Sequence, residues 1–419
     1  MQKDKLVVVG QGYVGLPIAM RAVEAGFNVV GLDVDEVRVA SLQEGTSYVE
    51  DVSDDQLQDA VASNVYRAST DGEEMVGFAF AIITVPTPLK ETVPDLSFIE
   101  HSAAAIAPHV EPGSTIVLES TTYPGTTEQL LVPILEQGSS LRAGQDFYVG
   151  YSPERIDPGN QVYTFENTPK VVSGVDPKSL SVISDLYARL VDKVVPVSSP
   201  KEAELTKLLE NTFRHVNIAL VNELAVFAHD LGIDIWESID AAATKPFGFM
   251  PFTPGPGVGG HCLPVDPSYL SWQVRRTLGH NFRFVELAND VNDHMPDYVV
   301  QRVASGLNDV RKALRGSKVL LIGLAYKKNT GDARESPAIR VAELLAAQGA
   351  ELTTVEPHVE EHRLPGYLAK VELTPETVAQ ADAIVLLTDH DGIDYDLLED
   401  APGFVLDTRR RLGPSAVRL

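Results

Sequence analysis

The chain has 419 residues, 44% of them hydrophobic and 22% charged, and its formal net charge at pH 7 is −25. This length predicts two or three domains, and the acidic charge disfavours nucleic acid or an anionic membrane surface as a partner. No run approaches the roughly 18 apolar residues of a membrane span, and the first residues lead into an apolar strand without a secretory signal. The single cysteine, Cys262, excludes an internal disulfide and fits a reducing cytoplasm.

The chain proper begins with a Gly-x-Gly-x-x-Gly turn between a predicted strand at 6–9 and an apolar helix. In this context Gly10 makes the tight turn, Gly12 lets a pyrophosphate approach the backbone, and Gly15 packs helix on strand. The next predicted strand, 27–33, ends in Asp33, whose carboxylate can accept hydrogen bonds from a ribose diol and repels a 2′-phosphate. This predicts NAD rather than NADP, the alternative being that Asp33 is a solvated turn residue.

Strand and helix patterns continue to alternate after Asp33. We predict strands at 78–85, 114–121 and 147–151 and a helix at 96–110. Ligands of an open parallel sheet bind beyond the carboxyl ends of its strands. Three polar residues stand just past such ends and are therefore candidate ligand contacts, although each could also be a cap or turn residue: Thr87, Thr121 and Glu154.

A long helix is predicted from 200 to about 232, where apolar residues recur with a period near 3.6. Lys207 and Asn211 are four residues apart and share one face. Arg214, His215 and Asn222 extend this polar stripe. It is either a solvated face with local ion pairs or a functional one, and asparagine, a poor helix-interior residue, favours function. The mostly helical middle is also the expected interface of a homodimer or higher homo-oligomer.

The next stretch, 254–266, reads Pro-Gly-Pro-Gly-Val-Gly-Gly-His-Cys-Leu-Pro-Val-Asp. We expect a loop, because its glycines allow backbone to press against a ligand. It supplies the thiol of Cys262 and, four residues later, the carboxylate of Asp266. Taken alone, Cys262 could equally be a small buried core residue.

The last part of the chain predicts a second, smaller doubly wound sheet. Strand patterns occur near 316–326, 351–356, 383–387 and 404–407, with a helix at 336–348. This part lacks Gly-x-Gly-x-x-Gly, so its nucleotide need not be a dinucleotide. Lys327, Lys328 and Arg334 could neutralise a diphosphate or be solvated surface residues.

The predicted fold is therefore α/β, with two Rossmann-like doubly wound domains joined by a helical central region that contains a long helix. The expected division is a dinucleotide-binding domain over 1–197, a central helical region with the cysteine loop over 198–300, and a second doubly wound domain over 301–419.

Taken together, these motifs resemble the nucleotide-sugar 6-dehydrogenases of the UDP-glucose/GDP-mannose dehydrogenase family, over nearly the whole chain. The segments that carry the resemblance are 10–17, 85–88, 119–121, 152–155, 207–211 with Asn222-Glu223, 259–266 and 334–337. The resemblance implies that NAD oxidises the sugar C6 hydroxyl in two steps, by way of a Cys262 thiohemiacetal and thioester, to a uronate.

The resemblance also implies roles for individual residues, and it implies no metal. In catalysis Lys207 and Asn211 would stabilise an alkoxide or oxyanion, and Asp266, Glu154 and Thr121 would hold or activate water. The residues implied for NAD are Gly10, Gly12, Tyr13, Val14, Gly15, Asp33, Arg38, Thr87, Thr121 and Arg334. The resemblance also implies that the domain over 301–419 binds the nucleotide sugar. The residues implied for the nucleotide sugar are Glu154, Arg155, Lys207, Asn211, Arg214, Gly259 and Lys327.

The sequence departs from the glucose enzymes at two places. Val265 stands where they often carry lysine, and Pro158 stands where they often carry a second acid, with Asp157 as the nearest substitute. The segments 152–159, 245–252, 260–262 and 326–328 resemble the branch that oxidises UDP-N-acetylhexosamines, with UDP-GlcNAc as the expected type of substrate. UDP-glucose and dTDP-glucose are alternatives. A two-electron hydroxyacid dehydrogenase and a non-catalytic nucleotide-sugar sensor are more distant ones.

Overall fold

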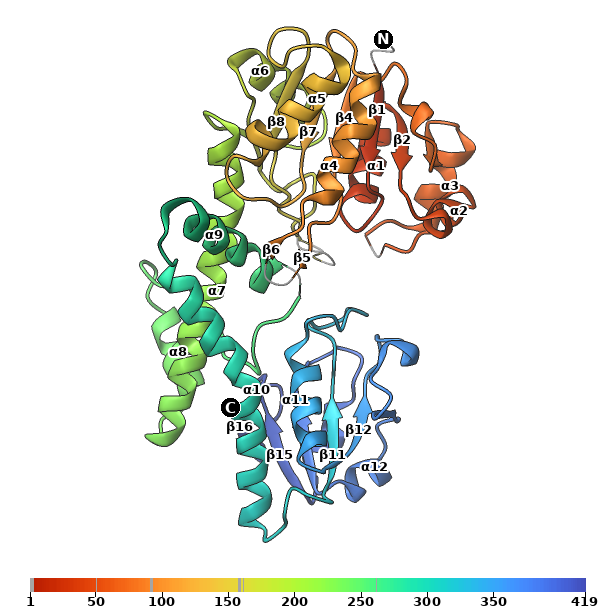
Figure 1. Ribbon diagram of the computed structural model, residues 1–419. Coiled ribbons are helices and arrows are strands. Elements are labelled where there is room, and N and C mark those ends of the chain that lie inside the picture. Colours follow the sequence, from red (N-terminus) through yellow and green to blue (C-terminus); the bar gives the residue numbers. More distant parts are fainter. Residues whose placement is uncertain (1–3, 50, 91–92, 157–159, 161, 261) are drawn as a thin grey trace. The chain divides into compact units, whose positions relative to one another are not determined.

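The structure is a computed structural model that describes residues 4–49, 51–90, 93–156, 160, 162–260 and 262–419 (Figure 1). The chain forms two compact units, 1–210 and 211–419. None of the helices within the described ranges is both long and apolar enough to cross a membrane.

The first unit is built on a six-stranded parallel sheet of order β3-β2-β1-β4-β7-β8. Its strands are β1 (Lys5–Val9), β2 (Asn28–Leu32), β3 (Tyr66–Ser69), β4 (Phe80–Ile83), β7 (Thr115–Leu118) and β8 (Tyr148–Tyr151). The strand order reverses between β1 and β4, and such a reversal leaves a crevice at the carboxyl edge of the sheet. The strands predicted from the sequence are confirmed.

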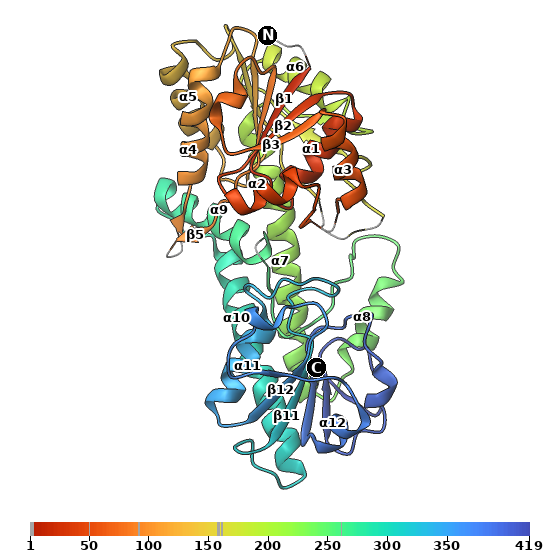
Figure 2. The same ribbon diagram turned by 90° about the vertical axis from the view of Figure 1, so that its right-hand side faces the viewer.

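Helices cover both faces of this sheet, as Figure 2 shows. α1 (Gly15–Glu24) and α3 (Asp54–Ala62) lie on one face, and α4 (Ser97–Ile106) and α5 (Val132–Ser139) lie on the other. Within β1, Leu6 and Val8 join the core under α1 while Val7 joins the core under α4. This alternation of side chains, with both faces apolar, is why the strands read as continuous hydrophobic runs.

Smaller elements complete the first unit. They are α2 (Glu36–Gln43), η1 (Gly72–Met75), β5 (Leu89–Lys90), β6 (Val93–Pro94), η2 (Ala107–His109), the π-helical η3 (Thr127–Leu131), β9 (Lys170–Val172), α6 (Pro177–Tyr187) and β10 (Val194–Pro196). The short strands β9 and β10 pair in parallel, and β5 and β6 pair antiparallel.

The predicted long helix is α7 (Pro200–Asp230), and the division between the two units falls inside it. It is followed by α8 (Ile235–Ala243), α9 (Cys262–Leu278) and α10 (Arg283–Asp309). The prediction of a loop over 254–266 extends too far toward the C-terminus, because α9 already begins at Cys262. Pro264 is compatible with this start, since the first turn of a helix does not use the backbone N–H that proline lacks.

The second unit repeats the topology of the first, with a parallel sheet of order β13-β12-β11-β14-β15-β16. Its strands are β11 (Lys318–Ile322), β12 (Glu351–Val355), β13 (Ala369–Lys370), β14 (Ala383–Leu386), β15 (Phe404–Asp407) and β16 (Val417–Arg418). The remaining elements are α11 (Pro337–Ala347), α12 (Pro375–Gln380), η4 (Glu361–Arg363) and η5 (Tyr395–Leu398). α10 and α11 cover one face and α12 the other (Figure 2).

Candidate active site

The glycine turn after β1 has the geometry of a dinucleotide-binding turn. Gly10 has a φ of 93° and donates its N–H to Leu32 O at 2.7 Å. A Cβ on Gly15 would lie 1.8 Å from Gly10 O, so only glycine lets α1 start this close to the turn. At Gly12, by contrast, no other described atom lies within 4 Å of the place of a Cβ, which leaves the backbone open to a ligand.

Asp33 follows β2 and faces this turn. Its Oδ2 accepts the Gln11 N–H at 2.8 Å, and its Oδ1 accepts the Asp35 N–H at 3.0 Å. Arg38 is half-exposed, and its Nη1 lies 3.7 Å from Asp33 Oδ2. The carboxylate therefore keeps acceptor capacity beside the turn, because an ionised carboxylate offers about four lone-pair positions.

These residues fit NAD. The N-cap residue of α1, Val14, makes no side-chain cap hydrogen bond, which leaves the N-terminus of the helix uncapped by a side chain and suited to a pyrophosphate, although the Leu16 N–H already donates to Gly12 O at 3.1 Å. Gly12 would let the pyrophosphate approach, and Asp33 would accept from the adenosine ribose. Tyr13 is exposed beside this turn, and Thr87 lies in the segment just after β4.

The first half of α7 contacts the segments that follow β7. Lys207 Nζ donates to Thr121 Oγ1, which unites two predicted catalytic residues. One turn earlier, Glu204 accepts the Gly125 N–H at 2.5 Å and the Thr127 N–H at 2.9 Å. The buried Glu204 carboxylate thereby caps the first turn of η3 and ties the Thr121 segment to α7.

A buried ionic cluster surrounds Glu154, just beyond β8. Lys170 Nζ lies 2.6 Å from Glu119 Oε2 and 3.4 Å from Glu154 Oε2, and all three side chains are buried. Tyr187 donates its hydroxyl to Glu119 Oε1. Burial is tolerable here because each charge has an opposite partner and further hydrogen bonds.

The cluster separates the pKa values of its two carboxyl groups. Burial raises the pKa of Glu119 to about 7, and Lys170 only partly offsets this. Burial alone would also raise the pKa of Glu154, but Lys170, the Ile156 N–H and Lys207 outweigh it and hold that pKa below its usual value. Glu154 is therefore ionised at neutral pH, and it can accept a proton there as a weak base.

Arg155, predicted to bind substrate, makes a two-pronged ion pair with Glu210 of α7. Its Nη2 and Nε lie 2.7 Å and 3.2 Å from the two Glu210 oxygens, and its Nη1 donates to Pro169 O. The pair fixes the segment that carries Glu154 to α7.

In the second unit, Asn211 Nδ2 donates to Asp266 Oδ2 at 2.6 Å, and both side chains are buried. Asp266 stands four residues after Cys262 in α9, which is about one helical turn. The contact brings together two residues that the sequence assigns to catalysis. The side chain of Cys262 and residues Asp157 and Pro158 lie outside the described part of the chain.

A chain of buried polar side chains connects α7 and α10 to the glycine-rich loop. His215 contacts Asn289 at 2.7 Å and Asn292 at 3.4 Å, and Asn222 donates to Asn292 at 2.9 Å. Asn222 Oδ1 in turn accepts the Gly255 N–H at 2.9 Å. His215 is therefore engaged within the core, and burial lowers its pKa.

The other predicted residues of the second unit are more exposed. Arg214 lies on the exposed face of α7, and Arg334 pairs with Asp332 at 2.7 Å. Lys327 is half-buried in the segment after β11. Gly259 packs closely, because a Cβ there would lie 2.7 Å from both Glu335 O and Pro337 Cδ.

Several residues of these sites carry no local sequence signal. Lys170 and Glu204 are examples, because their partners are 16 to 79 residues away along the chain. The one available hint for Lys170 is its place at the start of the apolar run Val171–Val172, where a lysine needs a buried partner.

Three domain models of one protein family match the chain. The NAD-binding, central and UDP-binding domains of the UDP-glucose/GDP-mannose dehydrogenase family match residues 4–191, 201–294 and 320–414. The chain belongs to this family. It is an NAD-dependent nucleotide-sugar 6-dehydrogenase, as the sequence motifs indicate.

Named relatives lie in the UDP-N-acetylhexosamine branch. UDP-N-acetyl-D-glucosamine 6-dehydrogenase of Pseudomonas aeruginosa is 38% identical over 363 residues, 86% of this chain and 84% of that protein. UDP-N-acetyl-D-mannosamine dehydrogenase of Pyrococcus horikoshii is 34% identical over 387 residues, 92% of this chain and 89% of that protein. These relatives agree with the branch that the sequence motifs resemble.

Solved structures show the same fold for different sugars. UDP-D-ManNAc dehydrogenase of Pyrococcus horikoshii has a TM-score of 0.89 and 31% identity, covering 99% of this chain and 97% of that one. A UDP-glucose dehydrogenase of Pyrobaculum islandicum has a TM-score of 0.86 and 28% identity, covering 97% and 94%. The fold of this dehydrogenase therefore does not select the sugar.

For the NAD site of this dehydrogenase, we predict that Asp33→Asn reduces the preference for NAD over NADP in kcat/KM at least about tenfold. The amide still accepts the Gln11 N–H but no longer repels a 2′-phosphate, and Arg38 lies beside it. Steady-state kinetics with both cofactors measure the ratio. Asp59→Asn, which alters an exposed acidic residue of α3, should leave the ratio unchanged. An unaltered ratio in Asp33→Asn would exclude this role.

We predict that the stability of the folded enzyme depends on pH through Glu204. Burial raises its pKa to about 7, although Thr127 and Gly125 donate hydrogen bonds to it. The Glu204 carboxyl therefore keeps its proton in the folded enzyme at pH values above about 4.5, where the unfolded chain releases it. As the pH rises from about 4.5 to about 7, the contribution of Glu204 to the free energy of unfolding falls. The decrease is at most about 1.4 kcal/mol per pH unit.

Glu204→Gln removes this titration, so its urea midpoint should change less than that of the wild type across the same pH window. The control is Glu223→Gln, which alters an exposed residue of the same helix and should follow the wild type. Parallel curves for the wild type and Glu204→Gln would show that Glu204 does not titrate in this range.

Proposed function

We propose that this enzyme oxidises the C6 hydroxyl of a UDP-N-acetylhexosamine to the uronate in two NAD-dependent steps, with Cys262 as covalent anchor. The observation that carries the proposal is the buried hydrogen bond between Asn211 and Asp266. It holds Asp266, four positions after Cys262, against Asn211 of α7. Asn211 stands one helical turn after Lys207. Two successive oxidations of the same carbon need a covalent anchor such as Cys262, because a free aldehyde could hydrate or leave.

In the first oxidation the C6 alcohol passes its proton to a bound water, which Asp266 and Glu154 would hold, and loses a hydride, so that it becomes an aldehyde. NAD, when bound, supplies the hydride acceptor for each oxidation. Lys207 carries three N–H donors, one of which faces Thr121, and it would stabilise the developing alkoxide. Asn211 would add a second donor, with its orientation fixed by Asp266.

In the second oxidation the Cys262 sulfur bonds to the aldehyde carbon, and the thiol proton moves to the aldehyde oxygen. The resulting thiohemiacetal loses its hydroxyl proton and a hydride and becomes a thioester. Water then adds to the carbonyl carbon and the C–S bond breaks, which releases the uronate and returns the thiol. Glu154, held ionised by Lys170, would accept the proton of this water, and Thr121 would orient it.

The division of labour follows the three parts expected from the sequence. NAD would bind to 1–197, the chemistry would centre on 198–300, and the nucleotide would bind to 301–419 through Lys327 and the backbone near Gly259. Arg334 would assist NAD, and Arg155 and Arg214 would lie near the sugar. The thiol and NAD chemistry suit a reducing compartment, so we propose a cytoplasmic enzyme, which fractionation of the source cells would check.

The decisive measurement is the number of NADH molecules formed per sugar nucleotide. We predict two for the wild type with UDP-GlcNAc, and no more than one for Cys262→Ala, because the aldehyde then has no anchor. Parallel assays with UDP-GalNAc, UDP-ManNAc, UDP-glucose, dTDP-glucose and GDP-mannose identify the sugar and base. Mass spectrometry of the quenched enzyme should find the acylated cysteine.

Three results would contradict the proposal in different ways. One NADH per sugar in the wild type would indicate a two-electron enzyme. Full turnover by Cys262→Ala would remove the covalent anchor. Binding of sugar nucleotide without NADH formation would indicate a sensor. A preference for UDP-glucose or dTDP-glucose would keep the mechanism and change the substrate.

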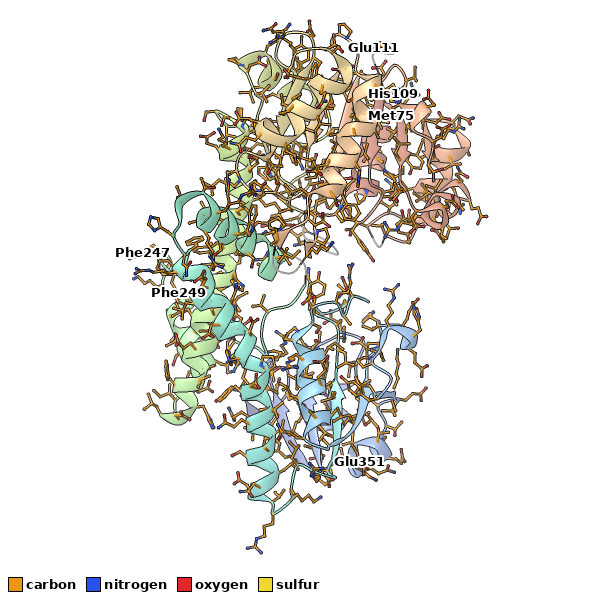
Figure 3. The ribbon with its side chains drawn as sticks, in the orientation of Figure 1. Met75, His109, Glu111, Phe247, Phe249 and Glu351 are labelled. Carbon is orange, nitrogen blue, oxygen red and sulfur yellow. The ribbon has the colours of Figure 1, made fainter. Side chains whose placement is uncertain are left out.

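We further propose that the enzyme is a homodimer in which α7 pairs with its copy. Leu220, Leu224 and Phe227 of α7, and Leu231 directly after it, are exposed with spacings of four, three and four, the pattern by which helices pair. Phe247 and Phe249, labelled in Figure 3, are exposed between α8 and α9 and enlarge the apolar surface of this unit. Exposed apolar patches of this kind mark association sites.

We predict that Leu224→Glu yields monomers in sedimentation equilibrium, because a charge in the middle of a helix seam stays unpaired when the seam closes. The matched change Glu223→Ala, at the neighbouring exposed position, should leave a dimer. A wild type that sediments as a monomer, or a dimer that survives Leu224→Glu, would place the interface elsewhere or remove it.

A further inference from the structure

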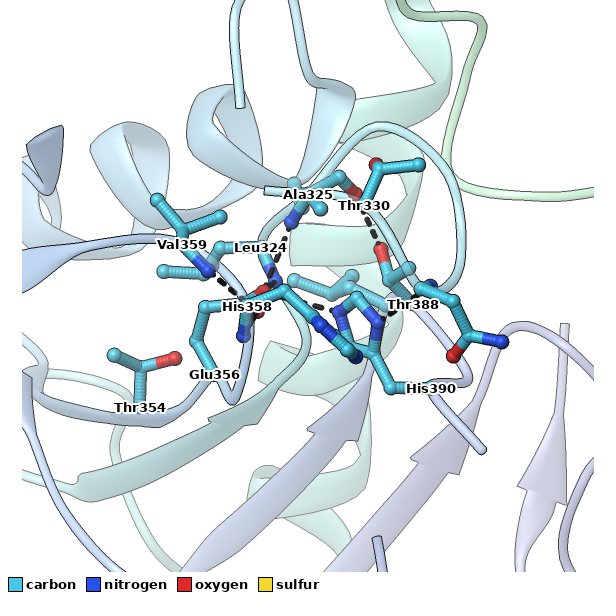
Figure 4. Close-up of polar contacts among 12 residues, drawn as sticks. Leu324, Ala325, Thr330, Thr354, Glu356, His358, Val359, Thr388 and His390 are labelled. Atoms are coloured by element: carbon cyan, nitrogen blue, oxygen red, sulfur yellow. Dashed lines mark hydrogen bonds and ion pairs between the residues drawn. The ribbon is translucent and has the colours of Figure 1, made fainter. Parts of the chain in front are cut away.

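A buried carboxylate organises the carboxyl edge of the second sheet (Figure 4). Glu356 follows β12, and its two oxygens accept four backbone N–H groups at 2.6 to 3.2 Å. The donors belong to Leu324, Ala325, His358 and Val359. Burial alone would raise the pKa of Glu356, but His390 and these donors hold it at about 2. Glu356 is therefore ionised at neutral pH.

His390 links this carboxylate to the segment after β11. Its Nε2 lies 3.1 Å from Glu356 Oε2, and its Nδ1 lies 2.9 Å from the Asn329 N–H. Because a backbone N–H can only donate, Nδ1 is the acceptor, and the ring proton sits on Nε2 facing Glu356. Both side chains are fully buried. The Tyr395 hydroxyl donates to His390 O and fixes its backbone.

The segment held in this way, residues 324–330, carries Tyr326 and Lys327. The Thr388 hydroxyl donates to Ala325 O at 2.6 Å, and the Thr330 hydroxyl donates to Lys327 O at 3.0 Å. His390 adds the tie at Asn329. The backbone of Lys327 is thus held on both sides.

The same segment supports the glycine-rich loop ahead of Cys262. A Cβ added to Gly260 would lie 2.7 Å from the Tyr326 ring, and one added to Gly259 would lie 3.1 Å from Tyr326 Cβ. The two glycines therefore pack directly on Tyr326, so a displacement of residues 324–330 would reach this loop.

We propose that His390 is a positioning residue for the nucleotide sugar. Its two ring nitrogens join Glu356 to Asn329 and so hold Lys327 where it meets the diphosphate of a UDP-sugar. His390 acts through this segment and does not itself contact the ligand. The proposal rests on the proposed function in one respect, the role of Lys327 toward the nucleotide.

Two substitutions separate the ring nitrogens. Glutamine places its amide near the site of Nε2, so His390→Gln keeps the Glu356 contact and removes the acceptor for Asn329. Asparagine places its amide near the site of Nδ1, so His390→Asn keeps that acceptor and removes the Glu356 contact. Glu356 retains its four backbone donors in both variants.

The experiment is calorimetric titration of the intact wild-type enzyme and both variants with UDP. We expect His390→Gln to raise the Kd for UDP about tenfold and His390→Asn to raise it less than about threefold. Titration with NAD, which binds the first unit, should give the same Kd for all three proteins. A parallel rise in KM for the sugar nucleotide, with KM for NAD unchanged, is the kinetic counterpart.

Three outcomes would overturn the proposal. They are an unchanged Kd for UDP in His390→Gln, equal losses in the two variants, and a matching loss of NAD binding. A wild type without affinity for UDP would overturn it as well. UDP binding involves no hydride transfer, so a failure of the two-NADH stoichiometry leaves this test intact, and the reverse also holds.

Discussion

Both sheets depend on one contact between a carboxylate and a glycine turn. In the first sheet Asp33, just after β2, accepts the N–H of Gln11, and in the second Glu356, just after β12, accepts that of Leu324. In each case the donor follows a glycine with positive φ, which turns the peptide toward the carboxylate. The contact fixes the chain where it leaves the first strand, and the ligand crevice of a doubly wound sheet lies at this place.

Asp33 and Glu356 differ in how many hydrogen bonds they accept from their own backbone. Asp33 accepts N–H groups from Gln11 and Asp35 and keeps lone pairs for a ribose. Glu356 accepts four backbone N–H groups and faces His390, so little acceptor capacity remains. We propose that Asp33 offers its remaining acceptor capacity to the ribose of NAD, whereas Glu356 serves the backbone of its own sheet.

Periodic apolar patterns and local motifs made most of this fold predictable from sequence. Most strands of both sheets, α7 and the NAD turn follow from residues adjacent in the chain. The strands β3, β13 and β16, which lie at sheet edges and have two to four residues, were not predicted. The start of α9 at Cys262 was missed because glycines and prolines before and after it indicate a loop. The Lys170 cluster and the Glu356–His390 pair were missed for another reason. Lys170 is 16 and 51 residues from its two partners in the sequence, and Glu356 is 34 residues from His390. A local sequence pattern cannot indicate contacts between residues so far apart.

The long helix α7 has a mechanical consequence. Lys207 belongs to the first unit and Asn211 to the second, yet both stand on one unbroken helix of 31 residues. At about 1.5 Å of rise per residue, their backbones are about 6 Å apart along its axis. Intrahelical hydrogen bonds maintain that spacing through any rearrangement that leaves the helix intact. The spacing of these two residues along the helix axis is therefore the same in every state of the enzyme in which α7 is unbroken.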